Sequence, residues 1–328
     1  MKILVINNEG GNIDIEKKVI LDNVKNCALE VKYVNSTDVK ATRKEVIDAD
    51  AVIAVNVDFD RETLETMEKC KIIATQTIGF DTIDIKAATE LGIAVTNNPS
   101  YCVEEVAAHT VALALACNRN LSVYNQITRK KIWNADEVYT YGEMHRISES
   151  TLGVVGLGNI GKRVIKIMQA MGMKAIGYDP FVEAEEFEKI GVKKVDTLEE
   201  IFSQSDIITL HTPLNEKTKN MVSMPLLKLM KKTAVLINAA RGGIVNETDL
   251  YKALSEEMFA GLGTDVINDE KTFETPLYEL ERALITPHIA YYTEEALDEC
   301  RRVSAEQVVQ VIEDNKKPEH LVNKDVKI

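Results

Sequence analysis

Gly153-Val-Val-Gly-Leu-Gly-Asn-Ile-Gly161 is the stretch of sequence that decides the fold. It begins within an apolar run and precedes a segment, 162–171, whose apolar residues recur at helical spacing. A strand, a glycine-rich turn and a helix in this order are typical of a dinucleotide-binding unit. Gly156 would allow the tight turn, Gly158 would let a pyrophosphate approach the backbone, and Gly161 would let the helix pack closely on the strand. Because glycines also cluster in ordinary turns and helix caps, the motif needs support from its surroundings.

Asp179 gives that support at the end of the next predicted strand, eighteen residues after Gly161. A carboxylate at this position can accept hydrogen bonds from the hydroxyls of an adenosine ribose and would repel a phosphate on the same ribose. Pro180 and Phe181, which follow, offer no arginine to receive such a phosphate. Asp179 therefore favours NAD over NADP. The ordinary alternative is a turn residue before proline, which Asp-Pro favours in any protein.

Charge and cysteine content limit the partners of the chain. Its 328 residues include 39 basic and 52 acidic ones, and the net charge of -13 disfavours nucleic acid and anionic membranes as partners. Five scattered cysteines without Cys-x-x-Cys spacing predict neither a disulfide framework nor a metal site. The N-terminal apolar run is too short for a signal peptide, and no later run reaches the roughly 20 residues that span a bilayer. We expect a cytoplasmic protein with free thiols.

Predicted strands alternate with helices along the whole chain, which indicates parallel sheets. At roughly 150 residues per domain, the length suggests two domains. We therefore expect an α/β protein with two doubly wound, Rossmann-like parallel sheets and a cleft between the domains. The first set of strands is expected at 2–6, 30–34, 51–55, 72–74 and 94–96, and the second at 151–155, 175–178, 207–210, 234–238, 260–264 and 284–286.

Helical spacing of apolar residues continues over 293–315, and no strand follows. This helix could return to the first domain, which would then be discontinuous, with hinges near Asn97 and Tyr292. The predicted division is residues 1–98 with 294–328 as the substrate-binding domain and 99–293 as the cofactor domain. The alternative is a C-terminal helix that packs on the second domain.

Beyond these patterns, the chain resembles the D-isomer-specific 2-hydroxyacid dehydrogenases over nearly its whole length. The landmarks of the family occur in order: the substrate-carboxylate loop, the crossing into the cofactor domain, the strand beside the adenine half, and two loops that carry polar residues. They correspond to Thr77–Asp84, Asn97–Thr110, Asp206–Pro213, Asn238–Gly243 and Thr286–Ile289. Within the family, Tyr101–His109 and His288–Glu294 look most like the branch that contains the C-terminal-binding-protein corepressors and their bacterial relatives.

The resemblance implies three catalytic residues whose chemistry suits hydride transfer. Arg241 would hold the carboxylate of a 2-oxo acid and polarise its carbonyl, because a guanidinium is permanently charged and fork-shaped. His288 would supply the proton, and Glu270 would pair with His288, orient it and favour its charged form. Taken singly, each has an ordinary alternative, namely a surface-loop charge, a core histidine and a member of a solvated acidic face.

The resemblance also implies the residues that line the two binding sites. NAD would be bound by Gly156, Gly158, Asn159, Ile160, Gly161, Asp179, His211, Thr212, Pro213, Thr218, Ala239, Ala240, Arg241, Asp265 and His288. Among these, Asp265 would receive the nicotinamide carboxamide, and His211 would form a wall of the pocket. The substrate would contact Ile78 and Gly79 through their backbone amides, and Tyr101, Arg241 and Tyr291 through their side chains. Many relatives carry arginine where this chain has Gln76, so a charge near the substrate carboxylate or the hinge is missing. His109, on an apolar helix, is expected to be structural.

These features predict a NAD-dependent D-2-hydroxyacid dehydrogenase that reduces a small 2-oxo acid. One alternative is phosphoglycerate dehydrogenase, which the absence of a basic cluster near the predicted pocket disfavours. A second is an NADH-sensing, corepressor-like binding protein with little turnover. The sequence leaves open the acid, the direction of flux and the extent of domain closure. A homodimer is expected, because the helix at 104–118 is apolar on more faces than one core needs and relatives use this region as the subunit contact.

Overall fold

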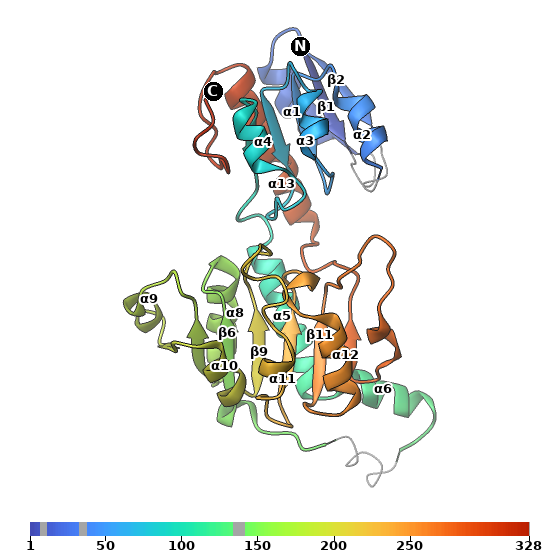
Figure 1. Ribbon diagram of the computed structural model, residues 1–328, viewed down its shortest axis with the longest axis vertical. Coiled ribbons are helices and arrows are strands. Elements are labelled where there is room, and N and C mark those ends of the chain that lie inside the picture. Colours follow the sequence, from blue (N-terminus) through green and yellow to red (C-terminus); the bar gives the residue numbers. More distant parts are fainter. Residues whose placement is uncertain (7–11, 33–37, 134–141, 328) are drawn as a thin grey trace. The chain divides into compact units, whose positions relative to one another are not determined.

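A computed structural model describes residues 1–6, 12–32, 38–133 and 142–327 of the chain. It forms two compact units, one made of Met1–Tyr101 with Thr293–Ile328 and the other of Cys102–Tyr292. Each unit contains one parallel sheet with helices packed on both faces, which confirms the predicted α/β class (Figure 1). None of the described helices combines the length and the apolar character needed to cross a bilayer.

The first unit has a five-stranded sheet in the order β2-β1-β3-β4-β5, all parallel. Its strands are β1 (Lys2–Ile6), β2 (Ala28–Lys32), β3 (Ala51–Ala54), β4 (Ile72–Thr75) and β5 (Ala94–Thr96). Its helices are α1 (Asp14–Asn23), α2 (Val39–Val46), α3 (Arg61–Glu65), α4 (Ile85–Glu90) and α13 (Glu294–Ile312).

Alternate residues of the central strands feed two separate cores in this unit. Ile3 and Val5 of β1 face α1 and α13, while Leu4 and Ile6 face α2, α3 and α4. Helix α13 also packs against β3 and β4 and contributes buried residues to the first of these cores. The C-terminal helix is therefore part of the first unit, although the whole second unit precedes it in the sequence.

The second unit has a seven-stranded parallel sheet in the order β12-β11-β10-β9-β6-β7-β8. Its strands are β6 (Thr151–Val155), β7 (Lys174–Tyr178), β8 (Lys193–Lys194), β9 (Ile207–Leu210), β10 (Val235–Asn238), β11 (Gly261–Thr264) and β12 (Ala283–Ile285). Its helices are α5 (Val103–Asn118), α6 (Leu121–Arg129), α8 (Asn159–Ala170), α9 (Ala184–Glu188), α10 (Leu198–Gln204), α11 (Met224–Leu227) and α12 (Glu247–Ser255), with short 3-10 turns η2 (Ile147–Glu149), η3 (Gly242–Ile244) and η4 (Pro276–Glu279). The strand order reverses between β6 and β9, where sheets of this class bind ligands.

Two strands differ from the sequence prediction by more than one residue at an end. Strand β8 was missed because its two residues, Lys193 and Lys194, carry no apolar pattern at the edge of the sheet. Strand β2 begins two residues earlier than predicted, because its pairing with β1 starts at Lys2 opposite Ala28. The last predicted residues of that strand, 33–34, lie outside the described residues.

The glycine turn between β6 and α8 explains the fixed spacing of its glycines. Gly156 has a φ of +96°, and a Cβ there would lie 2.8 Å from the His211 carbonyl oxygen. A Cβ at Gly161 would lie 2.2 Å from the carbonyl oxygen of Gly156, so α8 meets the turn too closely for any side chain. A Cβ at Gly158, in contrast, would meet no atom within 4 Å. Internal packing therefore does not require glycine at position 158.

Replacing Gly161 with alanine should destabilise the second unit by about 2 kcal/mol, because the backbone must move to relieve the clash. The comparison variant is Gly158→Ala, which should cost less, about 1 kcal/mol, since a methyl group there meets open space and only the N-cap preference for glycine over alanine is lost. Urea unfolding followed by circular dichroism would compare the two variants. Equal stabilities would contradict the proposed packing role of Gly161.

Candidate active site

The predicted catalytic residues follow three neighbouring strands of the second sheet. Strands β10, β11 and β12 are adjacent and parallel, so their carboxyl ends lie at the same edge. Arg241 follows β10, Glu270 follows β11, and His288 follows β12. This edge is where open parallel sheets present their ligand-binding residues.

The backbone around Arg241 is fixed by Asn238, the last residue of β10. The Asn238 side-chain amide donates to the Arg241 carbonyl oxygen at 2.9 Å and accepts from the Ala240 N–H at 3.1 Å. Directly after Arg241, a Cβ at Gly242 would lie 2.0 Å from the carbonyl oxygen of Ile267, so only glycine fits. These contacts hold the turn and the half-buried arginine that it carries.

His288 and Glu270 form a direct pair. The distance between His288 Nδ1 and Glu270 Oε2 is 2.7 Å, and both side chains are a little over one-third exposed. An ionised carboxylate only accepts hydrogen bonds, so the Nδ1–H donates and the ring is oriented by this bond. The other ring nitrogen, Nε2, has no partner among the described residues and remains available for a ligand.

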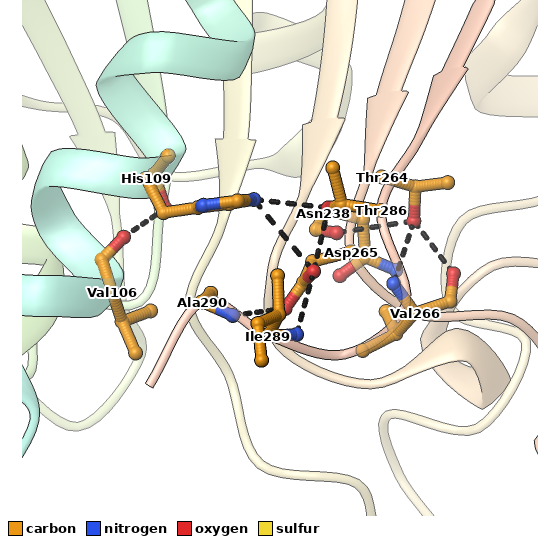
Figure 2. A network of polar contacts seen from close by, with 10 residues as sticks. Val106, His109, Asn238, Thr264, Asp265, Val266, Thr286, Ile289 and Ala290 are labelled. Carbon is orange, nitrogen blue, oxygen red and sulfur yellow. Dashed lines mark hydrogen bonds and ion pairs between the residues drawn. The ribbon is translucent and has the colours of Figure 1, made fainter. Parts of the chain in front are cut away.

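His288 also has a left-handed backbone conformation, with a φ of +52°. A non-glycine residue adopts this conformation at a cost and keeps it only where the surroundings enforce it. Asp265 enforces it, because its carbonyl oxygen accepts from the His288 N–H at 2.8 Å. The Asp265 carboxylate accepts from the N–H groups of Ile289 at 3.0 Å and Ala290 at 2.8 Å (Figure 2). Asp265 is only 1% exposed, so these bonds are shielded from water.

A cavity of about 550 Å³ lies beside the His288–Glu270 pair within the second unit. The wall of this cavity contains His288, Glu270, Asp265 and Thr286, together with apolar side chains of β12 and of the segment that precedes β12. Such a mixture of apolar surface and a few polar groups is typical of a small-molecule site.

The residues at the switch point of the sheet fit a dinucleotide. Gly158 leaves open space over the N-terminus of α8, where backbone N–H groups favour a negative charge. Two buried polar atoms, His211 Nε2 and Thr212 Oγ1, have no partner among the described residues. Both residues directly follow β9, and His211 lies against the glycine turn at Gly156. The Thr218 hydroxyl donates to the Pro213 carbonyl oxygen at 2.6 Å and closes the loop that follows.

Asp179 stands at the end of β7, as the sequence predicted, and its carboxylate already has two partners. One oxygen accepts from the Leu157 N–H within the glycine turn at 2.9 Å, and the other accepts from the Phe181 N–H at 2.9 Å. Asp179 therefore ties the glycine turn to the end of β7.

In the first unit, the loop after β4 has its carbonyl groups occupied and two N–H groups free. The carbonyl oxygens of Ile78 and Gly79 accept from the side chains of Asn97 at 2.7 Å and Thr77 at 2.6 Å. Neither the Ile78 nor the Gly79 N–H has an acceptor among the described residues. Two unpaired N–H groups in one loop suit an anion such as a carboxylate.

Three further predicted positions have clear local surroundings. Tyr101 is buried in the first unit, and Tyr291 is half-buried in the second. Gln76 is buried and donates to Glu16 Oε1 at 2.8 Å and to Ser304 Oγ at 3.2 Å, so it joins β4 to α1 and α13. The neutral amide of Gln76 thus has hydrogen-bond partners within the first unit.

Sequence reasoning assigned no functional role to Asn238, Thr286 or His109. The structure places Asn238 on the Arg241 turn and connects Thr286 and His109 with Asp265. Only the position of Asn238 at a strand end could have indicated its role, because His109 and Thr286 are 177 residues apart.

The cysteine thiols and the possible metal ligands bear on whether the protein has a reactive thiol or a metal site. Burial raises the pKa of the Cys70, Cys117 and Cys300 thiols to about 12, which keeps these thiols protonated. Among the described residues, no group of three His, Cys, Asp or Glu side chains converges as a metal site would require.

Comparison with known proteins agrees with this geometry. A family model described as D-isomer specific 2-hydroxyacid dehydrogenase, NAD binding domain, matches residues 111–290. Over 287 residues the chain is 37% identical to the glyoxylate reductase of Thermococcus litoralis, and the match covers 86% of this chain and 86% of that protein. It is 36% identical over 287 residues to the D-3-phosphoglycerate dehydrogenase of Methanocaldococcus jannaschii, a match to 86% of this chain but only 53% of that longer protein.

Among solved structures, D-lactate dehydrogenase from Aquifex aeolicus complexed with NAD and lactic acid is similar, with a TM-score of 0.87 and 29% sequence identity. The similarity covers 98% of this chain and 99% of that one. With the strand order, the glycine turn and the His288–Glu270 pair, these matches show that the chain belongs to the D-isomer-specific 2-hydroxyacid dehydrogenase family.

Proposed function

We propose that this protein is a NAD-dependent D-2-hydroxyacid dehydrogenase that acts as a reductase of a small 2-oxo acid. The observation that carries the proposal is the 2.7 Å contact between His288 Nδ1 and Glu270, which leaves Nε2 available at the sheet edge that also presents Arg241. Relatives named glyoxylate reductase and D-lactate dehydrogenase act on acids of this kind, which supports the assignment.

In the proposed reduction, the chain's own residues bind the acid and move a proton. NADH, when bound, supplies the hydride that the carbonyl carbon receives. The Arg241 guanidinium holds the acid and polarises its carbonyl group. His288 gives its Nε2 proton to the carbonyl oxygen as the C–H bond forms, and Glu270 compensates the charge of the imidazolium before that transfer. In the oxidation direction, neutral His288 accepts the hydroxyl proton at the same nitrogen.

We propose that the first unit binds the substrate carboxylate through the free N–H groups of Ile78 and Gly79. Two amide donors match the two oxygens of a carboxylate, and with Arg241 as the cation no second charge is needed at Gln76, where many relatives carry an arginine. Tyr101 and Tyr291 are proposed to contact the side chain of the substrate. They would therefore set specificity, whereas the catalytic residues act on the part common to all 2-oxo acids.

For the cofactor, we propose NADH over NADPH, with the pyrophosphate on the α8 N-terminus and the ribose at Asp179. Asn159 and Ile160 open that helix, and the remaining predicted contacts are Gly156, Gly158, Gly161, His211, Thr212, Pro213, Thr218, Ala239, Ala240 and Asp265. The Asp265 carboxylate is already bonded to the loop of His288, so a contact with the nicotinamide carboxamide would join the cofactor to that loop.

The homodimer and the cytoplasmic location also stay predictions. The exposed residues of α5 include Ala108 and Ala112, which lie one turn apart, and an exposed apolar helix face suits a subunit contact.

A steady-state assay of NADH oxidation with glyoxylate, pyruvate, larger apolar 2-oxo acids and 3-phosphohydroxypyruvate would test the function. We expect an unphosphorylated acid to be the best substrate. His288→Gln should lower kcat at least about 1,000-fold, because the proton donor is lost, and should leave the Kd for NADH within about twofold. His145→Gln, at an exposed histidine, is the matched control.

Each rival function gives a distinct result in the same panel. A clear preference for the phosphorylated acid would replace the proposal with phosphoglycerate dehydrogenase. Tight NADH binding without turnover of any acid would favour the corepressor-like binding protein. Unchanged turnover of His288→Gln would remove His288 from the mechanism.

Asp179→Asn should raise the ratio of kcat/KM with NADPH to kcat/KM with NADH by about tenfold. The amide keeps an acceptor for the Leu157 N–H but removes the charge that would repel a ribose phosphate. The control is Asp196→Asn, which changes the net charge equally at an exposed position. A ratio that changes equally in both variants would assign the preference to net charge and not to Asp179.

Acid should destabilise the protein through His211. Burial lowers its pKa from 6.5 to about 4, so between these pH values the unfolded chain binds a proton that the folded chain does not, and stability falls as the pH falls. From pH 7.5 to 5.0, urea unfolding should show a loss for the wild type about 2 kcal/mol larger than for His211→Gln. Parallel losses in the two proteins would show that His211 titrates normally.

A further inference from the structure

We propose that His109 is a positioning residue of the active site, which holds His288 through Thr286 and Asp265. Its imidazole begins a chain of hydrogen bonds that ends on the backbone N–H groups directly after His288 (Figure 2). The inference rests on the proposed catalytic function of His288, and it assigns a role to a histidine that does not touch the His288–Glu270 pair.

Packing of α5 on the sheet brings His109 to this place. His109, Leu113 and Cys117 are spaced by four residues and therefore lie on one face of the helix. A Cβ at Gly263 of β11 would lie 3.1 Å from Leu113 Cβ and 3.1 Å from Cys117 Sγ, so the helix lies close on the strand at a residue that has no side chain. One turn earlier, His109 Nε2 lies 2.9 Å from Thr286 Oγ1.

The direction of each hydrogen bond follows from the chemistry of the acceptor. Thr286 Oγ1 lies 2.6 Å from Asp265 Oδ1, and an ionised carboxylate only accepts, so the threonine hydroxyl donates to Asp265. With its proton used, Thr286 Oγ1 accepts from His109, whose Nε2 must therefore carry a hydrogen. The Nε2 of His109 is also 3.6 Å from Asp265 Oδ1, and that carboxylate is the charged group this nitrogen faces.

Asp265 passes this constraint to His288. The carboxylate receives Thr286 on one side and the N–H groups of Ile289 and Ala290 on the other. Without the His109 donor, the Thr286 hydroxyl is free to rotate and the carboxylate loses a fixed neighbour, so the loop that forces the left-handed backbone of His288 is less constrained. Proton transfer needs the imidazole in a narrow range of positions, so the chemical step is the quantity most sensitive to such a change.

The first test compares His109→Leu with His109→Gln, because glutamine carries an N–H donor at a similar reach. We expect His109→Leu to lower kcat about tenfold while the KM for the 2-oxo acid and the Kd for NADH stay within about twofold. His109→Gln should recover most of kcat, and His145→Leu, at an exposed histidine, should match the wild type. Equal losses in the leucine and glutamine variants would overturn the proposal, because they would show that only the shape of the imidazole matters.

The second test needs neither cofactor nor turnover. Hydrogen exchange of the peptide that spans residues 286–292 reports the protection that Asp265 gives to the amides of Ile289 and Ala290. We expect at least about fivefold faster exchange in His109→Leu and wild-type exchange in His109→Gln. Unchanged exchange together with unchanged kcat in His109→Leu would overturn the proposal.

Thr286 gives a second pair of variants if His109→Leu fails to fold. Thr286→Val removes the hydroxyl in the middle of the chain, whereas Thr286→Ser keeps it, so the valine variant should show the faster exchange and the serine variant should not. Equal exchange in the two variants would contradict the proposed chain of hydrogen bonds through Thr286. If the wild type turns over no acid, the proposed function fails, while the exchange experiment still decides whether His109 holds the His288 loop.

Discussion

Parallel pairing of β10, β11 and β12 is the constraint on which the candidate site depends. Because the three strands run in the same direction, the segments that leave them start from one edge of the sheet. Arg241, Glu270 and His288 thereby follow strands that end at one edge, without any local sequence signal for this arrangement. The sheet itself needs only buried apolar residues, so its strands tolerate many sequences, while the residues just beyond their ends are specific.

Two polar side chains convert this general arrangement into a defined geometry. Asn238 satisfies the backbone of the turn that carries Arg241, and Asp265 satisfies the backbone of the loop that carries His288. Both are almost fully buried, and each uses its oxygens on main-chain N–H groups, where a buried donor left without a partner would cost about 1–3 kcal/mol. Two buried side chains therefore hold the backbone segments that carry Arg241 and His288.

The sequence predicted the strands whose apolar residues are continuous, and it missed Lys193–Lys194, whose place in the sheet depends on pairing with β7 alone. It named Arg241, Glu270 and His288 because each follows a predicted strand and the set resembles a known family. His109 was interpreted as structural, since a histidine on an apolar helix has no local pattern that indicates its partner. The contact with Thr286 depends on how closely α5 packs at Gly263, which is a tertiary property.

The position of α13 has a consequence for biosynthesis. The second unit is one continuous segment, Cys102–Tyr292, and can complete its sheet during translation. One face of the first sheet, in contrast, lacks the α13 core residues Ala305, Val308, Val311 and Ile312 until residues 305–312 have been synthesised. The Gln76 amide, which donates to Glu16, likewise lacks its second acceptor, Ser304, until α13 has been synthesised. The nascent first unit therefore exposes an apolar sheet face while its neighbour in the sequence is already folded, and this is the interval in which the chain is most prone to aggregate or to need a chaperone.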